Sequence, residues 1–136
     1  MMKDSNLTFG EFIKRRRMQD PRQLTLKDLS AALGMSVSLL CDVEQGRRKA
    51  FEGDVIEKLC AFLELSEEDR ALAYDLAANS KRTIPADIDD FMMYTEMGAS
   101  ARFAMRMSQS GYLTQEDWDE ITRRAVERMQ KQKGEE

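Results

Sequence analysis

The sequence predicts an all-α fold: a five-helix domain followed by a small C-terminal helical region. Apolar residues recur at helical spacing in successive segments, and several segments begin with a Ser or Thr that can cap a helix. No run of alternating β-branched residues predicts a strand, and the chain contains two prolines. With 136 residues, 42% of them hydrophobic and 34% charged, the chain is long enough to bury a core.

The first helix is expected over residues 7–18, where Thr8 and Glu11 have the spacing of a capping box. Pro21 excludes a helix that continues through the following loop. The basic run at residues 14–17 has two interpretations. It can be a solvated helix end that the helix dipole favours, or it can bind phosphate.

The segment from residue 24 to residue 48 has the pattern of two short helices joined by a tight turn. Thr25 is the expected N-cap of the first helix, with Asp28 as its reciprocal partner. Gly34 ends that helix, because glycine adopts the left-handed conformation without a side-chain penalty. Ser36 caps the second helix, and Gly46 ends it. Two short helices around a glycine turn are typical of a helix-turn-helix.

This segment resembles the phage-repressor/Cro-like helix-turn-helix family, also called the XRE-like family. The resemblance rests on the helix-opening threonine, a small residue, the turn glycine, an aliphatic residue and a final Glu-x-Gly, which are here Thr25, Ser30, Gly34, Leu40 and Glu44-Gln45-Gly46. Two positions depart from the family pattern. Ser30 replaces the usual alanine, and Leu26 stands where many members carry a phosphate-contacting glutamine. With its flanking helices, the resemblance covers about residues 1–78.

The resemblance implies that residues 37–45 form a recognition helix for the major groove of double-stranded DNA. The residues expected to contact bases are Ser36, Val37, Ser38, Asp42 and Gln45. The residues expected to contact phosphates are Thr25, Lys27, Arg16, Arg17, Arg47, Arg48 and Lys49. The outward face of the helix lacks Arg, Lys and Asn, so we expect modest direct readout and a larger share from backbone contacts and DNA shape. Asp42 can accept a hydrogen bond from cytosine or pair with Arg48 or Lys49.

Charge is segregated along the chain. The formal net charge of −4 combines +4 over residues 1–50, −6 over residues 51–80 and −2 over residues 81–136. Because a local basic face attracts phosphate regardless of the total, the acidic balance does not exclude DNA binding.

Helices over residues 53–63 and from Ser66 to Ala78 are expected to complete the first domain, assigned to residues 1–80. A linker at 79–86 then leads to three helices near 86–97, 99–109 and 115–132. We assign residues 81–136 to dimerisation or partner binding, because so short a region buries too little surface to be secure alone. The apolar residues chosen for a homodimer contact are Phe91, Phe103, Met107, Trp118 and Ile121. The alternative is a surface whose methionines bind a different protein.

Catalytic chemistry has little support. The chain has no histidine, and its two cysteines, Cys41 and Cys60, are too few for a zinc site. We therefore expect no enzyme, no metal and no cofactor. Cys60 is expected in the core, and Cys41 either packs or senses oxidants. Neither a signal peptide nor a membrane-length apolar run is evident, which favours the cytoplasm.

These observations leave three hypotheses for function. The favoured one is a sequence-specific DNA-binding transcriptional regulator, a repressor that acts as a dimer. The alternative is a protein-interaction module, antitoxin-like or an accessory factor, whose C-terminal helices bind a protein partner. An enzyme is the least favoured.

Overall fold

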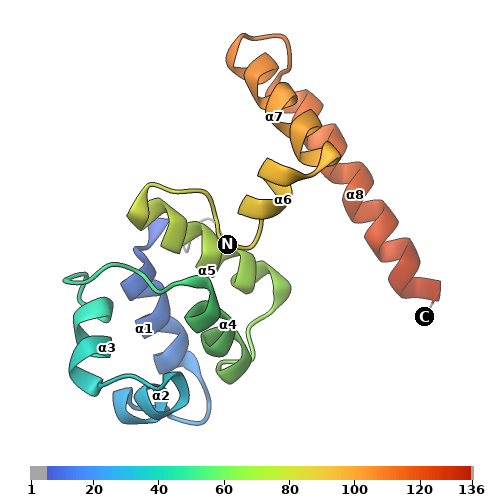
Figure 1. The fold of residues 1–136 in the computed structure, drawn as a ribbon. Coiled ribbons are helices and arrows are strands. Elements are labelled where there is room, and N and C mark those ends of the chain that lie inside the picture. The colour runs from blue at the N-terminus through green and yellow to red at the C-terminus, as the bar shows by residue number, and fades with distance from the viewer. Residues whose placement is uncertain (1–5, 136) are drawn as a thin grey trace. The chain divides into compact units, whose positions relative to one another are not determined.

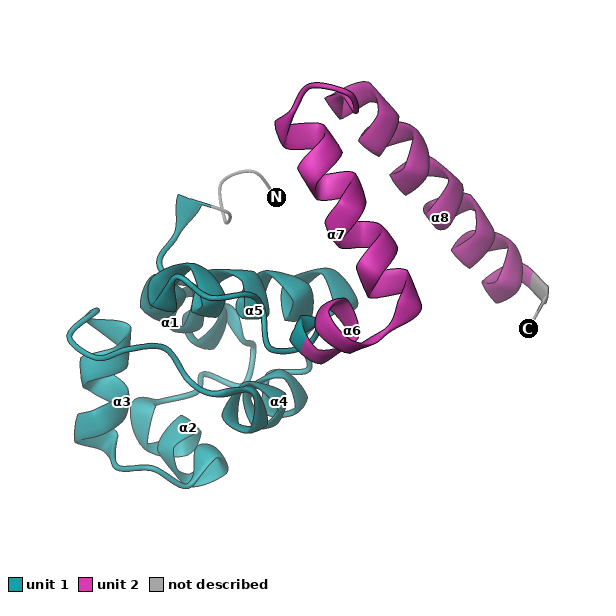
Figure 2. Ribbon diagram, turned by 45° about the horizontal axis from the view of Figure 1, so that its top comes forward, with its two compact units in different colours: residues 1–89 teal, residues 90–136 magenta. Residues whose placement is uncertain are grey.

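The computed structural model describes residues 6–135, and the regular structure in this part of the chain is entirely helical (Figure 1). The predicted all-α class is therefore confirmed. The helices are α1 (Phe9–Gln19), α2 (Leu26–Leu33), α3 (Val37–Glu44), α4 (Gly53–Phe62), α5 (Glu67–Lys81), α6 (Asp89–Tyr94), α7 (Glu96–Gln109) and α8 (Gln115–Glu135). Two compact units divide the chain, unit 1 over residues 1–89 and unit 2 over residues 90–136 (Figure 2).

Unit 1 contains one hydrophobic core, to which α1 to α5 all contribute. Its largest fully buried side chains are Phe12, Ile13, Leu29, Leu40, Ile56 and Leu59. The rings of Phe9 and Phe51 meet edge to face with their centroids 5.3 Å apart, which joins α1 to the segment before α4. Because α2 and α3 each bury one apolar face in this core, their relative orientation is fixed by packing.

The N-caps expected at Thr8, Thr25 and Ser36 are present, and Ser66 and Thr114 cap α5 and α8 in the same way. Each of these hydroxyl oxygens accepts a hydrogen bond from the backbone N–H three residues later. At Thr25 the reciprocal bond also forms, because the carboxylate of Asp28 accepts from the Thr25 N–H at 2.9 Å. Each cap satisfies a backbone donor that the first turn of a helix would otherwise leave without a partner.

Two glycines end the helices of the turn motif. Gly34 has a φ of +70° and Gly46 a φ of +79°, a region in which a side chain would be strained. After α3, the Arg47 N–H bonds to the Asp42 carbonyl and the Gly46 N–H bonds to the Val43 carbonyl. This pair of bonds is a Schellman motif, and it turns the chain back beside α3.

The structure moves several of the predicted boundaries. Helix α5 continues to Lys81, so the linker expected at 79–86 begins too early. The ammonium group of Lys81 donates to the Phe51 carbonyl, which holds this last turn against the start of α4. Helix α6 is shorter than expected, and α7 begins at Glu96 because Thr95 caps it. Thr95 lies inside the segment 86–97 that the sequence pattern assigned to a single helix, so its role as a cap was not predicted.

Unit 2 has almost no buried interior. Of its described residues, only Gly98 is buried. A Cβ at that position would lie 2.3 Å from the carbonyl oxygens of Phe91 and Met92, so glycine is required where α7 begins against α6. Helices α7 and α8 run in opposite directions (Figure 2). The Trp118 indole N–H donates to the Ser108 hydroxyl at 2.7 Å and so ties their adjoining ends together.

None of the helices described is both long enough and apolar enough to span a membrane.

Candidate nucleic-acid interface

Helix α3 presents its first turn to the surface and its other side to the core. Ser36, Val37 and Ser38 are exposed, whereas Leu40 and Val43 are buried. The Ser36 hydroxyl oxygen accepts from the Leu39 N–H at 3.1 Å, so its own O–H remains able to donate. The structure thus brings three of the predicted base-contacting residues together at one end of the helix. The other two, Asp42 and Gln45, lie in its last turn and at its C-cap.

A buried ion pair fixes the far end of α3. The Arg17 guanidinium donates to both carboxylate oxygens of Glu44, each at 3.0 Å, and to the Leu24 carbonyl at 3.1 Å. The two side chains are 12% and 2% exposed, respectively. The pKa of Arg17 is raised because its hydrogen bond to Glu44 favours the charged form. One side chain of α1 therefore holds the segment before α2 and the end of α3 in register.

The backbone of α1 also lies in close contact with the last turn of α3, at Gly10. A Cβ on Gly10 would lie 2.2 Å from the Val43 carbonyl oxygen and 2.8 Å from that of Glu44. Both neighbours are backbone atoms, which cannot rotate away. Helix α1 can therefore approach the last turn of α3 only because residue 10 is glycine.

The basic segment after α3 is paired with α3 itself. Asp42 lies 3.3 Å from the Nε of Arg47 and 4.0 Å from the Nε of Arg48. Both arginine side chains remain more than half exposed. The sequence anticipated the pairing with Arg48 but named Lys49 rather than Arg47 as the other partner. The Schellman turn at Gly46 explains the choice, since it folds Arg47 back beside Asp42.

The remaining residues proposed for phosphate contact fall into two groups. Thr25, Lys27 and Lys49 are exposed at the surface of unit 1. Arg16 instead donates from Nε and Nη2 to the two carboxylate oxygens of Asp69 on α5, at 3.2 and 3.1 Å. Arg16 thus ties α1 to α5, as Arg17 ties α1 to α3. A role of either arginine in phosphate binding stays a prediction.

The two cysteines have different surroundings. Cys60 is buried in the core, and burial raises the pKa of its thiol. Cys41 lies half-buried on α3. No disulfide joins them.

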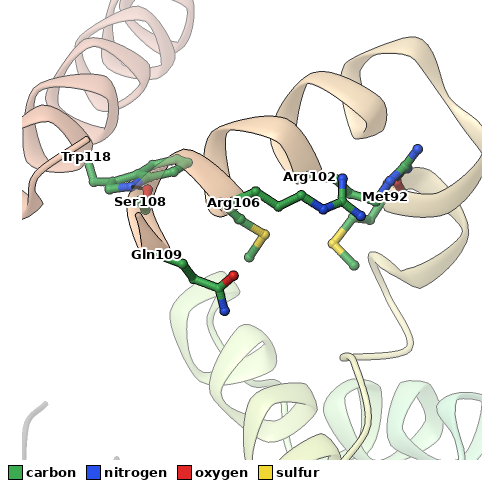
Figure 3. Close-up of a pocket in the computed structure, with 7 residues that line it drawn as sticks. Met92, Arg102, Arg106, Ser108, Gln109 and Trp118 are labelled. Carbon is green, nitrogen blue, oxygen red and sulfur yellow. Dashed lines mark hydrogen bonds between the residues drawn. The ribbon is translucent and has the colours of Figure 1, made fainter. Parts of the chain in front are cut away.

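The residues predicted for dimerisation lie in unit 2, and most of them are on its surface. Phe91, Phe103 and Ile121 are exposed, while Met107 and Trp118 are half-buried. Trp118 also borders an open apolar pocket between α7 and the start of α8 (Figure 3), whose lining residues are Met92, Arg102, Met105, Arg106, Ser108, Gln109 and Trp118. The Arg102 guanidinium is held by the Met92 carbonyl, so it braces α7 against α6.

Comparison with known protein families identifies the first unit. The model of a family described as a helix-turn-helix domain matches residues 8–73, which run from the α1 cap into α5. Residues 8–73 form a helix-turn-helix domain. This match confirms the resemblance to the XRE-like family, and it ends before unit 2. No curated protein and no solved structure matched the chain significantly.

Proposed function

We propose that this protein is a transcriptional regulator, a repressor that binds double-stranded DNA as a dimer with α3 in the major groove. The helix-turn-helix domain supports DNA binding. The observation that carries the proposal is the arrangement around α3: an exposed, side-chain-capped first turn and an exposed basic segment directly after the last turn. A bound dimer represses simply by occupying DNA that the polymerase needs.

Base readout would come from the first turn of α3. The free Ser36 O–H can donate to a base or a phosphate oxygen, and the Ser38 hydroxyl can do either. Val37, 41% exposed, can pack on a thymine methyl group. None of these contacts is bidentate, so each discriminates among bases weakly. DNA shape and backbone contacts would supply much of the preference.

Phosphate contacts would come from Thr25 and Lys27 at the start of α2, and from Arg47, Arg48 and Lys49 after α3. Arg17 would instead act as a positioning residue, because its guanidinium is occupied by Glu44 and Leu24. The Asp42 carboxylate competes with phosphate for the two arginines beside it, and its own charge repels the DNA backbone. Asp42 would therefore limit non-specific binding.

The test is to select preferred duplexes from a random pool and to measure affinities by fluorescence anisotropy at two salt concentrations. Replacing Arg47 and Arg48 with alanine should weaken binding to every sequence alike and lower the salt slope by about 0.9 per lost contact. Ser38→Ala should instead change the order of preferred sequences. Lys58→Ala, on the surface of α4, is the control for loss of a positive charge away from both α3 and α8. Affinities unchanged by both sets of substitutions would refute these roles.

Asp42 offers a further test of the proposal because its predicted effect has the opposite sign. Asp42→Asn keeps the shape of the side chain but removes the charge that holds Arg47 and Arg48. Affinity for all duplexes should rise, and the salt slope should steepen. A loss of affinity without loss of folding would instead indicate that Asp42 accepts a hydrogen bond from a base.

The alternative function is a protein-interaction module, and the apolar surface of unit 2 favours it. Exposed methionines and aromatics can adapt to a partner's surface. A chain that selects no duplex from the random pool at low salt but stays folded would support this alternative against the regulator.

A further inference from the structure

Unit 2 exposes far more apolar surface than its size explains. Of the fourteen large apolar side chains exposed in the described part of the chain, ten lie in unit 2, although it is the smaller unit. A monomeric surface rarely carries so dense a group of exposed apolar residues without a partner. We therefore expect a binding partner to cover the exposed apolar surface of unit 2.

Helix α8 carries the most regularly spaced part of this exposed apolar surface. Every residue from Asp119 to Gly134 is exposed, yet α8 has a regular apolar stripe. Successive residues of a helix turn by about 100°, so Ile121 and Met129 lie within about 40° on either side of Ala125. Ile121 is 50% exposed and Met129 is 48% exposed. The small Ala125 lies at the centre of the stripe, where it would let a second helix approach closely.

The charges of α8 are divided between its halves. Residues 115–121 carry Glu116, Asp117, Asp119 and Glu120 with no cation, while Arg123, Arg124, Arg128, Lys131 and Lys133 lie beyond, with Glu127 as the only acid before Gly134. Residues 115–121 therefore have a formal charge of −4, and the rest of α8, residues 122–135 with Glu135 included, one of +3. Two such helices side by side attract each other when antiparallel and repel each other when parallel.

We propose that α8 pairs with α8 of a second copy of this chain, antiparallel, about a two-fold axis near Ala125. This pairing deepens the dimer of the proposed function by naming its surface and its direction. The division of charge selects a second copy over an unrelated partner, because the apolar stripe and the charge pattern are complementary to themselves. An isologous contact about a two-fold axis has this property.

The alignment can be worked out from helical geometry. With the axis at Ala125, Ile121 of one copy stands level with Met129 of the other, because each is four residues from the axis. Asp119 and the other copy's Lys133 lie on the same flank of the stripe, about 3 Å apart in height at 1.5 Å per residue. Each dimer contains both contacts twice. Arg123 adds nothing across the interface, because Glu120 and Glu127 of its own helix already hold it.

Cysteine cross-linking of the full chain tests the axis. In a Cys41→Ser background, mild oxidation should join two copies of Ala125→Cys. It should leave the Met129→Cys variant and the outward-facing control Gln130→Cys monomeric when each is oxidised alone. An equal mixture of the Ile121→Cys and Met129→Cys variants should cross-link. Efficient cross-linking of Met129→Cys alone would show a parallel pair and overturn the proposal. Cross-linking of Gln130→Cys as efficient as that of Ala125→Cys would also overturn it. The same holds if Ala125→Cys does not cross-link although its circular dichroism spectrum matches that of the wild type.

Charge reversal tests the direction independently. Asp119→Lys or Lys133→Glu should each weaken the dimer about tenfold, since two exposed pairs become repulsive. The double variant should recover wild-type dimerisation, measured by light scattering over a dilution series. Additive losses in the double variant, or a wild-type monomer, would overturn the pairing.

These experiments use no DNA, so they separate the two proposals. If the protein binds DNA but its Ala125→Cys variant does not cross-link, only the α8 pairing is refuted. A chain that cross-links there but selects no duplex refutes only the regulator.

Discussion

Replacing Glu44 with alanine should destabilise the helix-turn-helix domain strongly. The substitution removes both 3.0 Å bonds to Arg17 and leaves a guanidinium that is only 12% exposed with the Leu24 carbonyl as its remaining partner. Breaking a buried pair in this way costs about 3–5 kcal/mol. Because Arg17 keeps one hydrogen bond and some exposure, we expect a loss of about 3 kcal/mol, or roughly a hundredfold in the unfolding equilibrium.

Urea unfolding followed by far-ultraviolet circular dichroism measures this loss. Tryptophan fluorescence is unsuitable, because the only tryptophan, Trp118, lies in unit 2. Hydrogen exchange of the amides of α1 and α3 would localise the effect to unit 1. The matched control is Asp42→Ala, which removes a carboxylate from the same helix but breaks exposed pairs. It should cost less than about 1 kcal/mol.

A double variant separates the pair's net contribution from the cost of leaving one charge alone. Arg17→Met with Glu44→Leu removes both charges and keeps similar volume, so it should be clearly more stable than Glu44→Ala alone. If Glu44→Ala cost no more than Asp42→Ala, the inference that this pair fixes the end of α3 would be refuted.

Three further predictions concern unit 1. Gly10→Ala places a methyl group against the Val43 carbonyl and should cost at least about 2 kcal/mol in urea unfolding and weaken DNA binding. Thr25→Ala removes the cap of α2 and should cost about 1 kcal/mol, with Thr25→Ser close to wild type. Hydrogen bonds from Arg22 lower the pKa of Asp20 to about 2. Its stabilising contribution is therefore full above the unfolded-state pKa and lost as the pH falls through the folded one. Asp20→Asn should lower the urea midpoint at pH 6 and approach wild type near pH 2.

Features encoded by neighbouring residues were predictable from the sequence. Thr25, Gly34, Ser36 and Gly46 act within four or five residues of themselves, so their side chains or missing side chains determine the local backbone directly. Apolar spacing then identified the buried faces of α2 and α3. These signals together were enough to predict the turn motif and the family.

Features that join distant segments were not predictable in the same way. The partners Arg17 and Glu44 are 27 residues apart, and the Gly10 contact depends on how α1 crosses α3. One signal was nevertheless available: Glu44 lies four residues after Leu40, on the buried face. A buried carboxylate needs a cation. Its identity could not be chosen among the arginines of α1 without the tertiary structure.

Dimerisation would supply the specificity that α3 lacks by itself. Its exposed first turn offers two hydroxyls and Val37, where a strong reader would offer bidentate contacts worth about 1–3 kcal/mol each. Asp42, which pairs with Arg47 and Arg48, would weaken the proposed phosphate contacts in addition. Two such domains joined through unit 2 would bind a pair of half-sites with the second contact made intramolecularly, so affinity would depend on half-site spacing as well as on sequence. Under the proposed arrangement, a weak recognition helix would discriminate well only as part of a dimer, because a single half-site would bind the protein weakly.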